Sequence, residues 1–487
     1  MQLKHYDAQR TANDTAYFFT CENELKALSS AAAEQAALLN IKPGQVEGLK
    51  SADNGCITRR FFVCLDKDLS YDKVEEGADK LLKAAKEQKV DSLSVVIAPS
   101  LAGFTEGLYK RLLLANDSFD RYKTTGIAPL NGQTEQQEKT VLKISFELAD
   151  ALSQEAESEK LRRADAAAQA IMLARRLVNE PANVMTPEKL AEEAKKQGEK
   201  HGFSVDVYDE KQIQAMGLHA FYSVAKGSDT PPRLIVMQYL NAPESDQRLA
   251  LIGKGLTYDS GGYALKPRQG MDTMYCDMGG SAAVIGAMCL LASLKARVNV
   301  LAVVAACENM VSGHAYRNGD IIPSLSGKFI EIQNTDAEGR LTLADAITYA
   351  ATVLKADRII DIATLTGACG IALGDHVTAL VADDEGLVSA LEDASRRSGD
   401  KIWRLPHFEQ FAKCNESERA DIKNTGGRAG GTITAGLFCR AFACGKGWAH
   451  LDIAATAFHE KPCAKSPAGA TGVGAELLAY AAQKLFA

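Results

Sequence analysis

The sequence lacks the segments that mark membrane-spanning and secreted proteins. Its start, MQLKHYDAQRTANDTAYFF, has no apolar run behind a basic cluster. Its longest apolar stretches, around Ser281–Leu294 and Val298–Cys307, are shorter than a bilayer crossing requires. These absences predict a cytoplasmic protein without a membrane partner.

Paired cysteines, a phosphate-binding loop and an excess of positive charge are also missing. The eleven cysteines are scattered and form no C-x-x-C pair, which argues against a disulfide framework and against a thiolate zinc site. Without a G-x-x-x-x-G-K-[ST] loop, a nucleotide-like ligand has no support. A net charge of −7 repels polyanions overall, so nucleic acid is not expected as the main partner.

What is present is the composition of an ordinary globular protein, with 46% hydrophobic and 24% charged residues. A chain of 487 residues is too long for one ordinary core, so two domains are expected. Apolar runs alternate with amphipathic stretches through both halves, and this alternation is typical of α/β folds. We predict a smaller N-terminal α/β domain and a larger C-terminal α/β domain with a central mixed, largely parallel sheet.

The predicted boundaries follow from an Ala-rich, charged helical stretch over 153–178 that ends at Asn179-Glu180-Pro181. The N-terminal domain is assigned to 1–152, the connecting helix to 153–180 and the C-terminal domain to 181–487. The N-terminal strands are predicted at 61–65, 93–98 and 141–148, with helices at 71–89 and 104–115. The C-terminal strands are predicted at 233–239, 248–252, 298–306, 330–333 and 358–362, with helices starting after Thr186 and at 279–294 and 341–353.

Two segments concentrate charged residues where strands are expected to give way to loops, the usual place of active sites in open α/β sheets. The first runs from G-K-G-L-T-Y-D-S-G-G at 253–262 through L-K-P to C-D-M-G-G at 276–280, and the second is N-T-D-A-E-G-R-L at 334–341. Asp336, Glu338 and Arg340 stand two apart, so an extended backbone would project all three to one side. Dipole compensation before a helix, with a surface ion pair, is the alternative interpretation.

The two segments together supply four carboxylates, from Asp259, Asp277, Asp336 and Glu338. Four negative charges in one place would be neutralised by two divalent cations. Oxygen-rich ligation without H-E-x-x-H or clustered cysteines fits Mn²⁺, Mg²⁺ or Zn²⁺ and leaves the metal open.

The second segment resembles the signature of the leucyl aminopeptidase family. The motifs G-K-G-x-T-Y-D-S-G-G, L-K-P, D-M-G-G, A-T-L-T-G-A at 363–368 and W-A-H-L-D-I-A at 448–454 look like family sequence in family order. The resemblance covers the chain from about Asn179 onward, whereas the N-terminal part is similar only in size and αβ character. It implies a metal-dependent aminopeptidase that acts on peptides, prefers leucine-like N-terminal residues and assembles as a homohexamer.

The resemblance also implies roles for individual residues. Lys254 and Asp277 would hold the tighter of two divalent metals (Mn²⁺ or Zn²⁺, with Mg²⁺ possible), Asp336 the exchangeable one, and Asp259 and Glu338 would bridge both. A lysine ligand must be neutral, which costs roughly 4 to 5 kcal/mol at pH 7. Lys266 would stabilise the oxyanion, and Arg340 would hold bicarbonate, the general base of the family. The first substrate side chain would be surrounded by Met274, Thr364, Gly367, Ala454 and Ala457.

Two other functions stay open on the residues alone. Carboxylates with Lys and Arg also suit a two-metal phosphoesterase, which turnover of p-nitrophenyl phosphate would reveal. A DNA-binding or regulatory role of the kind known for some bacterial relatives is the other, which a gel shift would test. The glycine-rich stretch Gly426–Gly431 also looks like family sequence, but no catalytic role is predicted for it.

Overall fold

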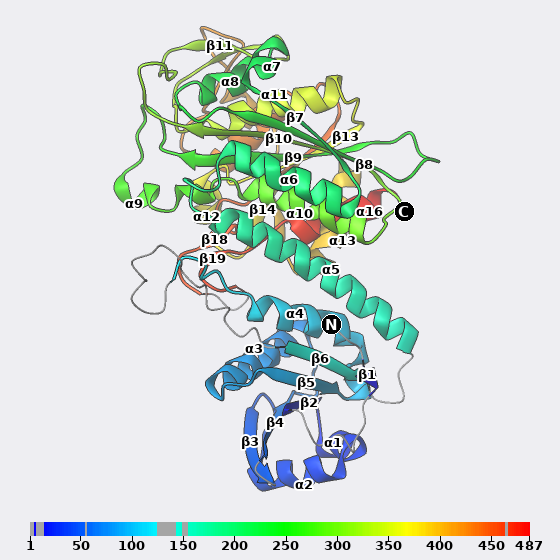
Figure 1. Ribbon diagram of the computed structural model, residues 1–487. Helices are drawn as coiled ribbons and strands as arrows, with labels where there is room; N and C mark the ends of the chain where they lie inside the picture. Colours follow the sequence, from blue (N-terminus) through cyan, green and yellow to red (C-terminus); the bar gives the residue numbers. More distant parts are fainter. Residues whose placement is uncertain (1–3, 6–13, 54–55, 124–142, 149–153, 463–465) are drawn as a thin grey trace. The chain divides into compact units, whose positions relative to one another are not determined.

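The computed structural model describes residues 4–5, 14–53, 56–123, 143–148, 154–462 and 466–487 (Figure 1). The chain divides into two compact units, Met1–Ala168 and Gln169–Ala487. The division falls inside helix α5 (Gln154–Asn179), which confirms a helix where the sequence predicts the connection. The predicted domain limits at 152 and 181 stay a prediction.

Unit 1 contains a six-stranded sheet among its described residues, in the order β1-β6-β5-β2-β4-β3. The pair of β3 and β4 is antiparallel and the other pairs are parallel. The strands are β1 (Lys4–His5), β2 (Asp14–Phe19), β3 (Val46–Asp53), β4 (Cys56–Cys64), β5 (Ser92–Ile97) and β6 (Lys143–Leu148). The helices are α1 (Glu22–Leu28), α2 (Ser30–Leu39), α3 (Tyr71–Glu87), η1 (Pro99–Phe104) and α4 (Thr105–Asn116).

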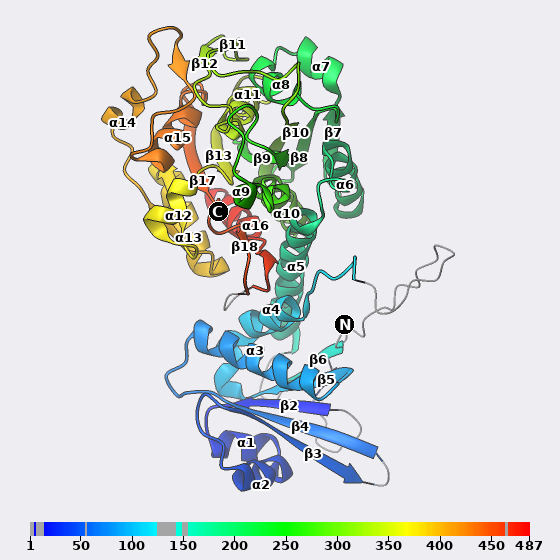
Figure 2. The same cartoon turned by 90° about the vertical axis from the view of Figure 1, so that its left-hand side faces the viewer.

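Strand β2 shows why this sheet is covered on both faces. Ala16 and Phe18 point into a core shared with α3 and α4, whereas Tyr17 and Phe19 point into a second core with α1 and α2. Successive side chains of a strand alternate between faces, so a continuously apolar strand needs a layer on each side. Figure 2 shows α1 and α2 on one face of this sheet and α3 on the other.

Unit 2 is built on an eight-stranded mixed sheet, counted over its described residues, in the order β15-β14-β17-β13-β9-β10-β8-β7. The neighbours β17, β13, β9 and β10 run parallel, and β7, β8 and β14 pair antiparallel with their neighbours β8, β10 and β17. The strands are β7 (Ser204–Tyr208), β8 (Arg233–Leu240), β9 (Leu249–Asp259), β10 (Asn299–Asn309), β13 (Arg358–Ala363), β14 (Thr378–Ala382), β15 (Ile402–Arg404) and β17 (Gly447–Asp452). The predicted mixed, largely parallel α/β sheet is confirmed.

Helices cover both faces of this sheet (Figures 1 and 2). One face packs a large apolar core against α8 (His219–Ala225), α11 (Gly339–Thr352) and α15 (Gly431–Arg440). The other carries α6 (Pro187–His201), α10 (Gly279–Ser293), α13 (Glu385–Ser398) and α16 (Ala475–Leu485). The predicted N-cap of α6 is confirmed, since the Thr186 side chain accepts a hydrogen bond of 3.2 Å from the Lys189 amide. Shorter elements are α7 (Glu210–Ala215), α9 (Arg268–Met271), η2 (Met274–Cys276), α12 (Gly367–Leu373), α14 (Glu409–Lys413), β18 (Phe458–His459) and β19 (Gly469–Ala470).

Two of the predicted strands of unit 2 differ from the structure in their extent or in the sheet to which they belong. The strand predicted over 248–252 continues to Asp259, so Lys254 lies within β9 and not in a loop. The strand predicted over 330–333 is β12 (Phe329–Glu331), which belongs to a separate small sheet with β11 (Ile321–Pro323) and β16 (Ile422–Lys423). Both differences arise because periodicity shows where an apolar run lies but not which strand pairs with it. The pairing sets the length of the strand and the sheet to which it belongs.

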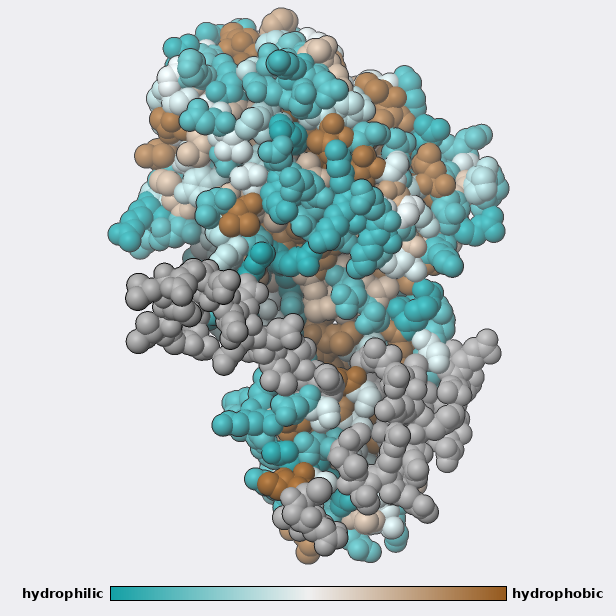
Figure 3. All heavy atoms as spheres, viewed as in Figure 1, coloured by the Kyte–Doolittle hydropathy of each residue, from teal (hydrophilic) through white to brown (hydrophobic). Residues whose placement is uncertain are grey.

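One stretch of the described chain, Arg268–Ser293, is long and apolar enough by length and composition to cross a membrane. In its most apolar window, 94% of the residues are buried inside the protein. Helix α10 within it is buried on every side, which explains its uniformly apolar sequence. On the face of unit 2 seen in Figure 3, hydrophobic residues are scattered among hydrophilic ones.

Candidate metal centre

The candidate site lies at the carboxyl ends of the four parallel strands of unit 2. Asp259 ends β9, Asn309 ends β10, Thr364 follows β13 and Asp452 ends β17. Asp259 and Asn309 are direct partners in the ladder between β9 and β10, after an irregularity at Cys307. In open α/β sheets this edge is where ligands bind, so the predicted position of the site agrees with the fold.

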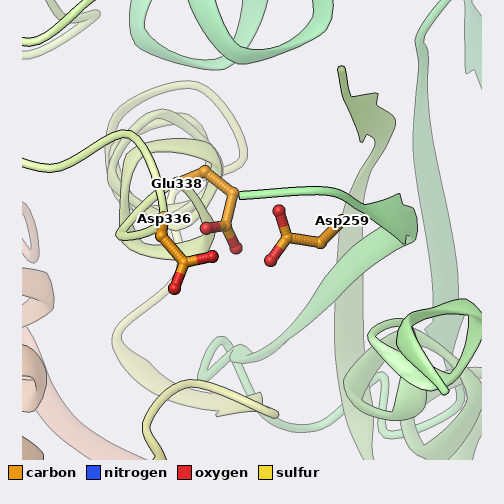
Figure 4. A group of neighbouring side chains, drawn as sticks. All are labelled: Asp259, Asp336 and Glu338. Carbon is orange, nitrogen blue, oxygen red and sulfur yellow. The ribbon is translucent and has the colours of Figure 1, made fainter. Parts of the chain in front are cut away.

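Three of the four predicted carboxylates converge on one point. Asp259, Asp336 and Glu338 each offer an oxygen, and these oxygens lie within 4.8 Å of one another. Figure 4 shows the carboxylate of Asp259 reaching from the end of its strand toward Glu338, with Asp336 beside them. These are the three described residues whose geometry could hold a metal ion between them.

The backbone that presents this group is not extended, so that part of the prediction is wrong. Asp336 sits in a turn, and Glu338 has helical angles (φ −81°, ψ −37°) as the residue before α11. Arg340 lies in the first turn of that helix. The turn brings Asp336 and Glu338 together without the two-residue alternation of a strand.

Two lysines hold the four carboxylates in pairs. Lys254 Nζ lies 2.7 Å from Asp277 Oδ2 and 2.9 Å from Glu338 Oε1. Lys266 Nζ lies 2.8 Å from Asp259 Oδ2 and 2.6 Å from Asp336 Oδ1. Apart from Arg340, the predicted charged residues of the two motifs therefore lie in one connected cluster. These six residues are Lys254, Asp259, Lys266, Asp277, Asp336 and Glu338.

The two lysines differ in how deeply their side chains are buried. The Lys254 side chain is only 3% exposed, whereas that of Lys266 is 16% exposed and lies toward the open side of the cluster. Burial by itself lowers the pKa of each ammonium, but the surrounding carboxylates, Asp277 foremost for Lys254 and Asp259 for Lys266, outweigh it and raise both pKa values. Both shifts favour the charged form of the lysine.

The carboxylates carry more negative charge than the lysines neutralise. Burial raises the pKa of Asp277 to about 6, with Lys254 opposing it, and raises the pKa of Glu338 to about 7, with repulsion from Asp259 adding to it. The pKa of Asp336 is also raised, chiefly by burial. If all four carboxylates ionise, as they would around bound cations, two negative charges remain beyond those that the two ammonium groups neutralise.

This donor set fits divalent cations. Glu338 Oε2 is buried and has no hydrogen-bond partner among the described residues, which leaves a carboxylate oxygen free for a ligand inside the cluster. Asp259 is held by its other oxygen, since Oδ1 accepts bonds of 2.9 Å from the Gly261 amide and 2.8 Å from Asn309 Nδ2. A preoriented set of carboxylate oxygens suits Mn²⁺, Mg²⁺ or Zn²⁺.

Close packing around Lys254 explains two of the glycines in the motifs. A Cβ at Gly339 would overlap the Lys254 side chain, and one at Gly280 would overlap the Ile362 carbonyl oxygen. These close approaches belong to the packing of α10 and α11 against β9.

Arg340 stands apart from the carboxylate cluster. Its guanidinium is buried, and Nη1 donates a hydrogen bond of 2.8 Å to the Asn424 carbonyl oxygen. Nε has no hydrogen-bond partner and no carboxylate lies at ion-pair distance among the described residues. Burial lowers its pKa. The alternative interpretation of a surface ion pair is excluded by this burial.

The predicted pocket residues lie along the neighbouring strand ends. Thr364 Oγ1 donates to Asp277 Oδ1 over 2.7 Å, and its carbonyl oxygen accepts from Lys254 Nζ over 2.9 Å. A Cβ at Gly279 would lie 3.2 Å from Ala457 Cβ and 3.4 Å from Thr364 Cγ2, so both of these predicted residues lie beside Gly279. Met274 accepts a long backbone bond from Asp277, Ala454 is bound through its amide to Asp452, and Gly367 begins α12.

Three residues outside the prediction organise the site. Asn309 fixes Asp259, and Asp452 Oδ1 accepts from the amides of Leu365, Thr366 and Ala454, which ties the two pocket segments together. Asn309 and Asp452 both end apolar strands. The signal that pointed to Asp259, a polar residue where a strand gives way to a loop, could therefore have pointed to them as well. The third, Asn424, follows the two-residue strand β16 and carries no such signal.

Comparison with known proteins shows which protein family this chain is similar to. Residues 172–479 match the model of the cytosol aminopeptidase family, catalytic domain. A probable cytosol aminopeptidase of Clostridium perfringens is 46% identical over 422 residues, covering 85% of this chain and 83% of the relative. One of Treponema denticola is 43% identical over 451 residues, covering 91% and 92%, and one of Aquifex aeolicus is 40% identical over 485 residues, covering 96% and 95%.

Solved structures agree over nearly the whole chain. The bottromycin maturation enzyme BotP in complex with Mn has a TM-score of 0.83 and 30% sequence identity, with 98% of this chain and 100% of that chain covered. A second structure of BotP has a TM-score of 0.82 and 30% identity, with 97% and 99% covered. The likeness thus extends over unit 1, where the sequence motifs were weakest.

Proposed function

The chain belongs to the cytosol aminopeptidase family, whose fold it shares, and we propose that it removes leucine-like residues from the N-termini of peptides with two divalent metal ions. Membership makes it a metal-dependent aminopeptidase, a peptidase of the hydrolase class. The observation that carries the finer proposal is the buried cluster of four carboxylates with two lysines and an excess of negative charge.

In this proposal, each residue of the cluster has a separate task. Lys254 and Asp277 would hold one metal, Asp336 the exchangeable one, and Asp259 and Glu338 would bridge them. When bound, such ions lower the pKa of a water molecule and act as Lewis acids toward a carbonyl group. Mn²⁺ or Zn²⁺ is the proposed occupant, with Mg²⁺ possible.

Two cationic side chains, Lys266 and Arg340, are proposed to act on the substrate carbonyl and on the proton of the attacking water. Lys266, charged and on the open side of the cluster, is proposed to bind the carbonyl oxygen of the scissile bond and to stabilise the oxyanion that develops there. Arg340, with Nε unpartnered, offers donors for bicarbonate, which would take the proton of the attacking water.

The proposed activity is tested with purified protein supplied separately with Mn²⁺, Zn²⁺ and Mg²⁺. Leucine p-nitroanilide should be hydrolysed and p-nitrophenyl phosphate should not, because the family to which the chain belongs consists of aminopeptidases. Turnover of the phosphate ester alone would replace the aminopeptidase with a phosphoesterase. A gel shift at physiological salt tests the DNA-binding role, and sedimentation tests the proposed homohexamer.

Arg340→Ala should give a mild loss of kcat and abolish any stimulation of the reaction by added bicarbonate. The reason is that this substitution removes the proposed anchor of the anion and leaves the carboxylate cluster, which Arg340 does not contact by an ion pair, intact. The measurement is kcat against bicarbonate concentration for parent and variant, with metal content determined in both. A bicarbonate response equal to that of the parent contradicts the role given to Arg340.

Peptides beginning with Leu or Met should be cleaved faster than peptides beginning with Asp, and N-acetylated peptides should resist cleavage. The residues proposed around the first side chain, Thr364 and Ala457 among them, are small or apolar and would leave a substrate carboxylate desolvated and unpaired. Acetylation removes the free amine that the metals are expected to bind. Rates on a matched set of three peptides and their acetylated forms decide the question, and rapid cleavage of an acetylated peptide would exclude an aminopeptidase.

The proposal also covers the location of the enzyme in the cell and the size of its substrates. Its relatives are named as cytosol aminopeptidases, which supports a cytoplasmic location and small peptides as substrates. Fractionation of cells that express the chain, with activity followed in each fraction, tests the location.

A further inference from the structure

The segment Ile422–Gly426 connects the small sheet of unit 2 with the candidate site and has no role in the proposed function so far. Strand β16 pairs in parallel with β12, with Ile422 opposite Ile330 and Lys423 opposite Glu331. The Asn424 amide then donates to the Glu331 carbonyl oxygen over 3.0 Å. The segment therefore runs directly beside the chain that leads from β12 into the N-T-D-A-E-G-R motif.

The Asn424 side chain is fully buried and binds the backbone of that motif on both sides of its turn. Oδ1 accepts bonds from the amides of Gln333, over 2.9 Å, and Asn334, over 3.2 Å. Nδ2 donates to the carbonyl oxygens of Asn334, over 2.6 Å, and Ala337, over 3.3 Å. One amide group thus fixes residues before and after Asp336.

The Asn424 backbone holds the catalytic arginine as well. Its carbonyl oxygen accepts the 2.8 Å bond from Arg340 Nη1, which is the hydrogen bond that this guanidinium makes among the described residues. The same residue therefore orients the turn carrying Asp336 and Glu338 and the guanidinium that follows them.

Close packing explains one glycine of the stretch after Asn424, Gly426. A Cβ at Gly426 would lie 2.7 Å from Asn415 Oδ1 and 2.7 Å from Thr434 Cβ, so a side chain does not fit there. The backbone at Gly426, two residues after Asn424, therefore lies close against Asn415 and against Thr434 of α15.

We propose that Asn424 is a positioning residue for hydrolysis, acting through the Asp336–Glu338 turn and through Arg340. The inference rests on the proposed function of the site. The segments with Thr364 and Ala454 are bound by Asp452 and not by Asn424, so binding of the substrate side chain is independent of it. Its loss is therefore expected in kcat, with KM for leucine substrates nearly unchanged.

Asn424→Ala is the test variant and Asn299→Ala its matched control. Asn299 is also buried, and its amide also binds backbone: Oδ1 accepts from Ala242 N over 3.0 Å, and Nδ2 donates to the Ala242 and Ser245 carbonyl oxygens. It lies at the opposite end of β10 from the site. Asn424→Ala should lower kcat on the order of tenfold to hundredfold, since small displacements of reacting groups have effects of this size. Asn299→Ala should lower the melting temperature and leave kcat near that of the parent.

Three outcomes decide between positioning and mere stability. Activity of the parent on leucine p-nitroanilide is measured first, and its absence overturns the proposed function. With an active parent, an equal fall of kcat in both variants, or an unchanged kcat in Asn424→Ala, overturns the role of Asn424. If Asn424→Ala does not fold, Asn424→Ser takes its place under the same criteria, since its hydroxyl keeps part of the bonding.

A second measurement tests whether Asn424 acts through Arg340. Arg340→Ala should reduce kcat by a smaller factor in the Asn424→Ala background than in the parent, because residues that act through one another are not additive. Factors that multiply would show that the two act separately and would remove Arg340 from the proposal.

Discussion

Treatment with a strong chelator should abolish hydrolysis of leucine p-nitroanilide, and Mn²⁺ or Zn²⁺ should restore it. Both lysines of the cluster are paired with carboxylates and have raised pKa values, so neither is proposed to take a proton from water. In the proposed mechanism the reactive water is supplied by bound metal. Activity is followed during dialysis against chelator and during return of each metal, and full activity in exhaustively demetallated protein contradicts the mechanism.

Metal that binds at this site should raise the free energy of unfolding of the protein. A ligand that binds only the folded state at 100 times its Kd adds about 2.7 kcal/mol to the free energy of unfolding, so the melting temperature should rise with added metal. Lys254 and Lys266 already neutralise part of the metal-free cluster, so the rise measures binding more than relief of repulsion. Asp259→Asn should abolish the rise. Asp345→Asn should retain it, because Asp345 is a buried carboxylate of α11 bound instead to the Phe221 and Leu325 amides.

Lys266→Ala should lower kcat by about 10²–10³ with metal content unchanged. Loss of one donor to a developing oxyanion typically has this effect, about 2.7 to 4 kcal/mol in activation free energy. The position supports the role, since the Lys266 ammonium is charged, lies between Asp259 and Asp336 and is the more exposed of the two lysines. The measurement is kcat and KM on leucine p-nitroanilide, together with metal analysis of the variant.

Lys328→Ala is the control for this substitution. Lys328 is a lysine of the same unit whose Nζ donates to the Ala441 carbonyl oxygen over 2.9 Å and faces the Phe442 ring, outside the candidate site. Its variant should keep the kcat of the parent. A Lys266→Ala protein with near-normal kcat, or one that has lost its metal, shows that Lys266 does not act on the oxyanion as proposed.

Local pattern predicted most of the regular structure of unit 2. The apolar runs of β8, β10 and β13, the cap of α6 and the buried helix α10 are visible in the sequence because burial and capping act over a few residues. The length of β9 and the separate sheet of β12 were not predictable in this way. They depend on which strand lies alongside, and that partner comes from elsewhere in the chain.

The charged residues of the site were recognisable, but their partners were not. The motifs placed four carboxylates and two lysines together, and the structure joins them in one cluster. The pairing of Lys254 with Asp277 and Glu338, and of Lys266 with Asp259 and Asp336, follows from the sheet and from the turn before α11. The expectation of an extended backbone at Asp336 failed because a turn brings the same side chains together by another route.

The sequence by itself determined the family, the α/β class and the identity of the charged residues, because these are written in motifs and periodicities of neighbouring residues. Only the tertiary structure decided how the motifs meet. Lys254 contacts the carbonyl of Thr364 from 110 positions away, and Arg340 contacts Asn424 from 84 positions away. Strand order and close packing at glycines set these contacts, so a buried amide such as Asn424, with no motif of its own, becomes part of the site only once the chain is folded.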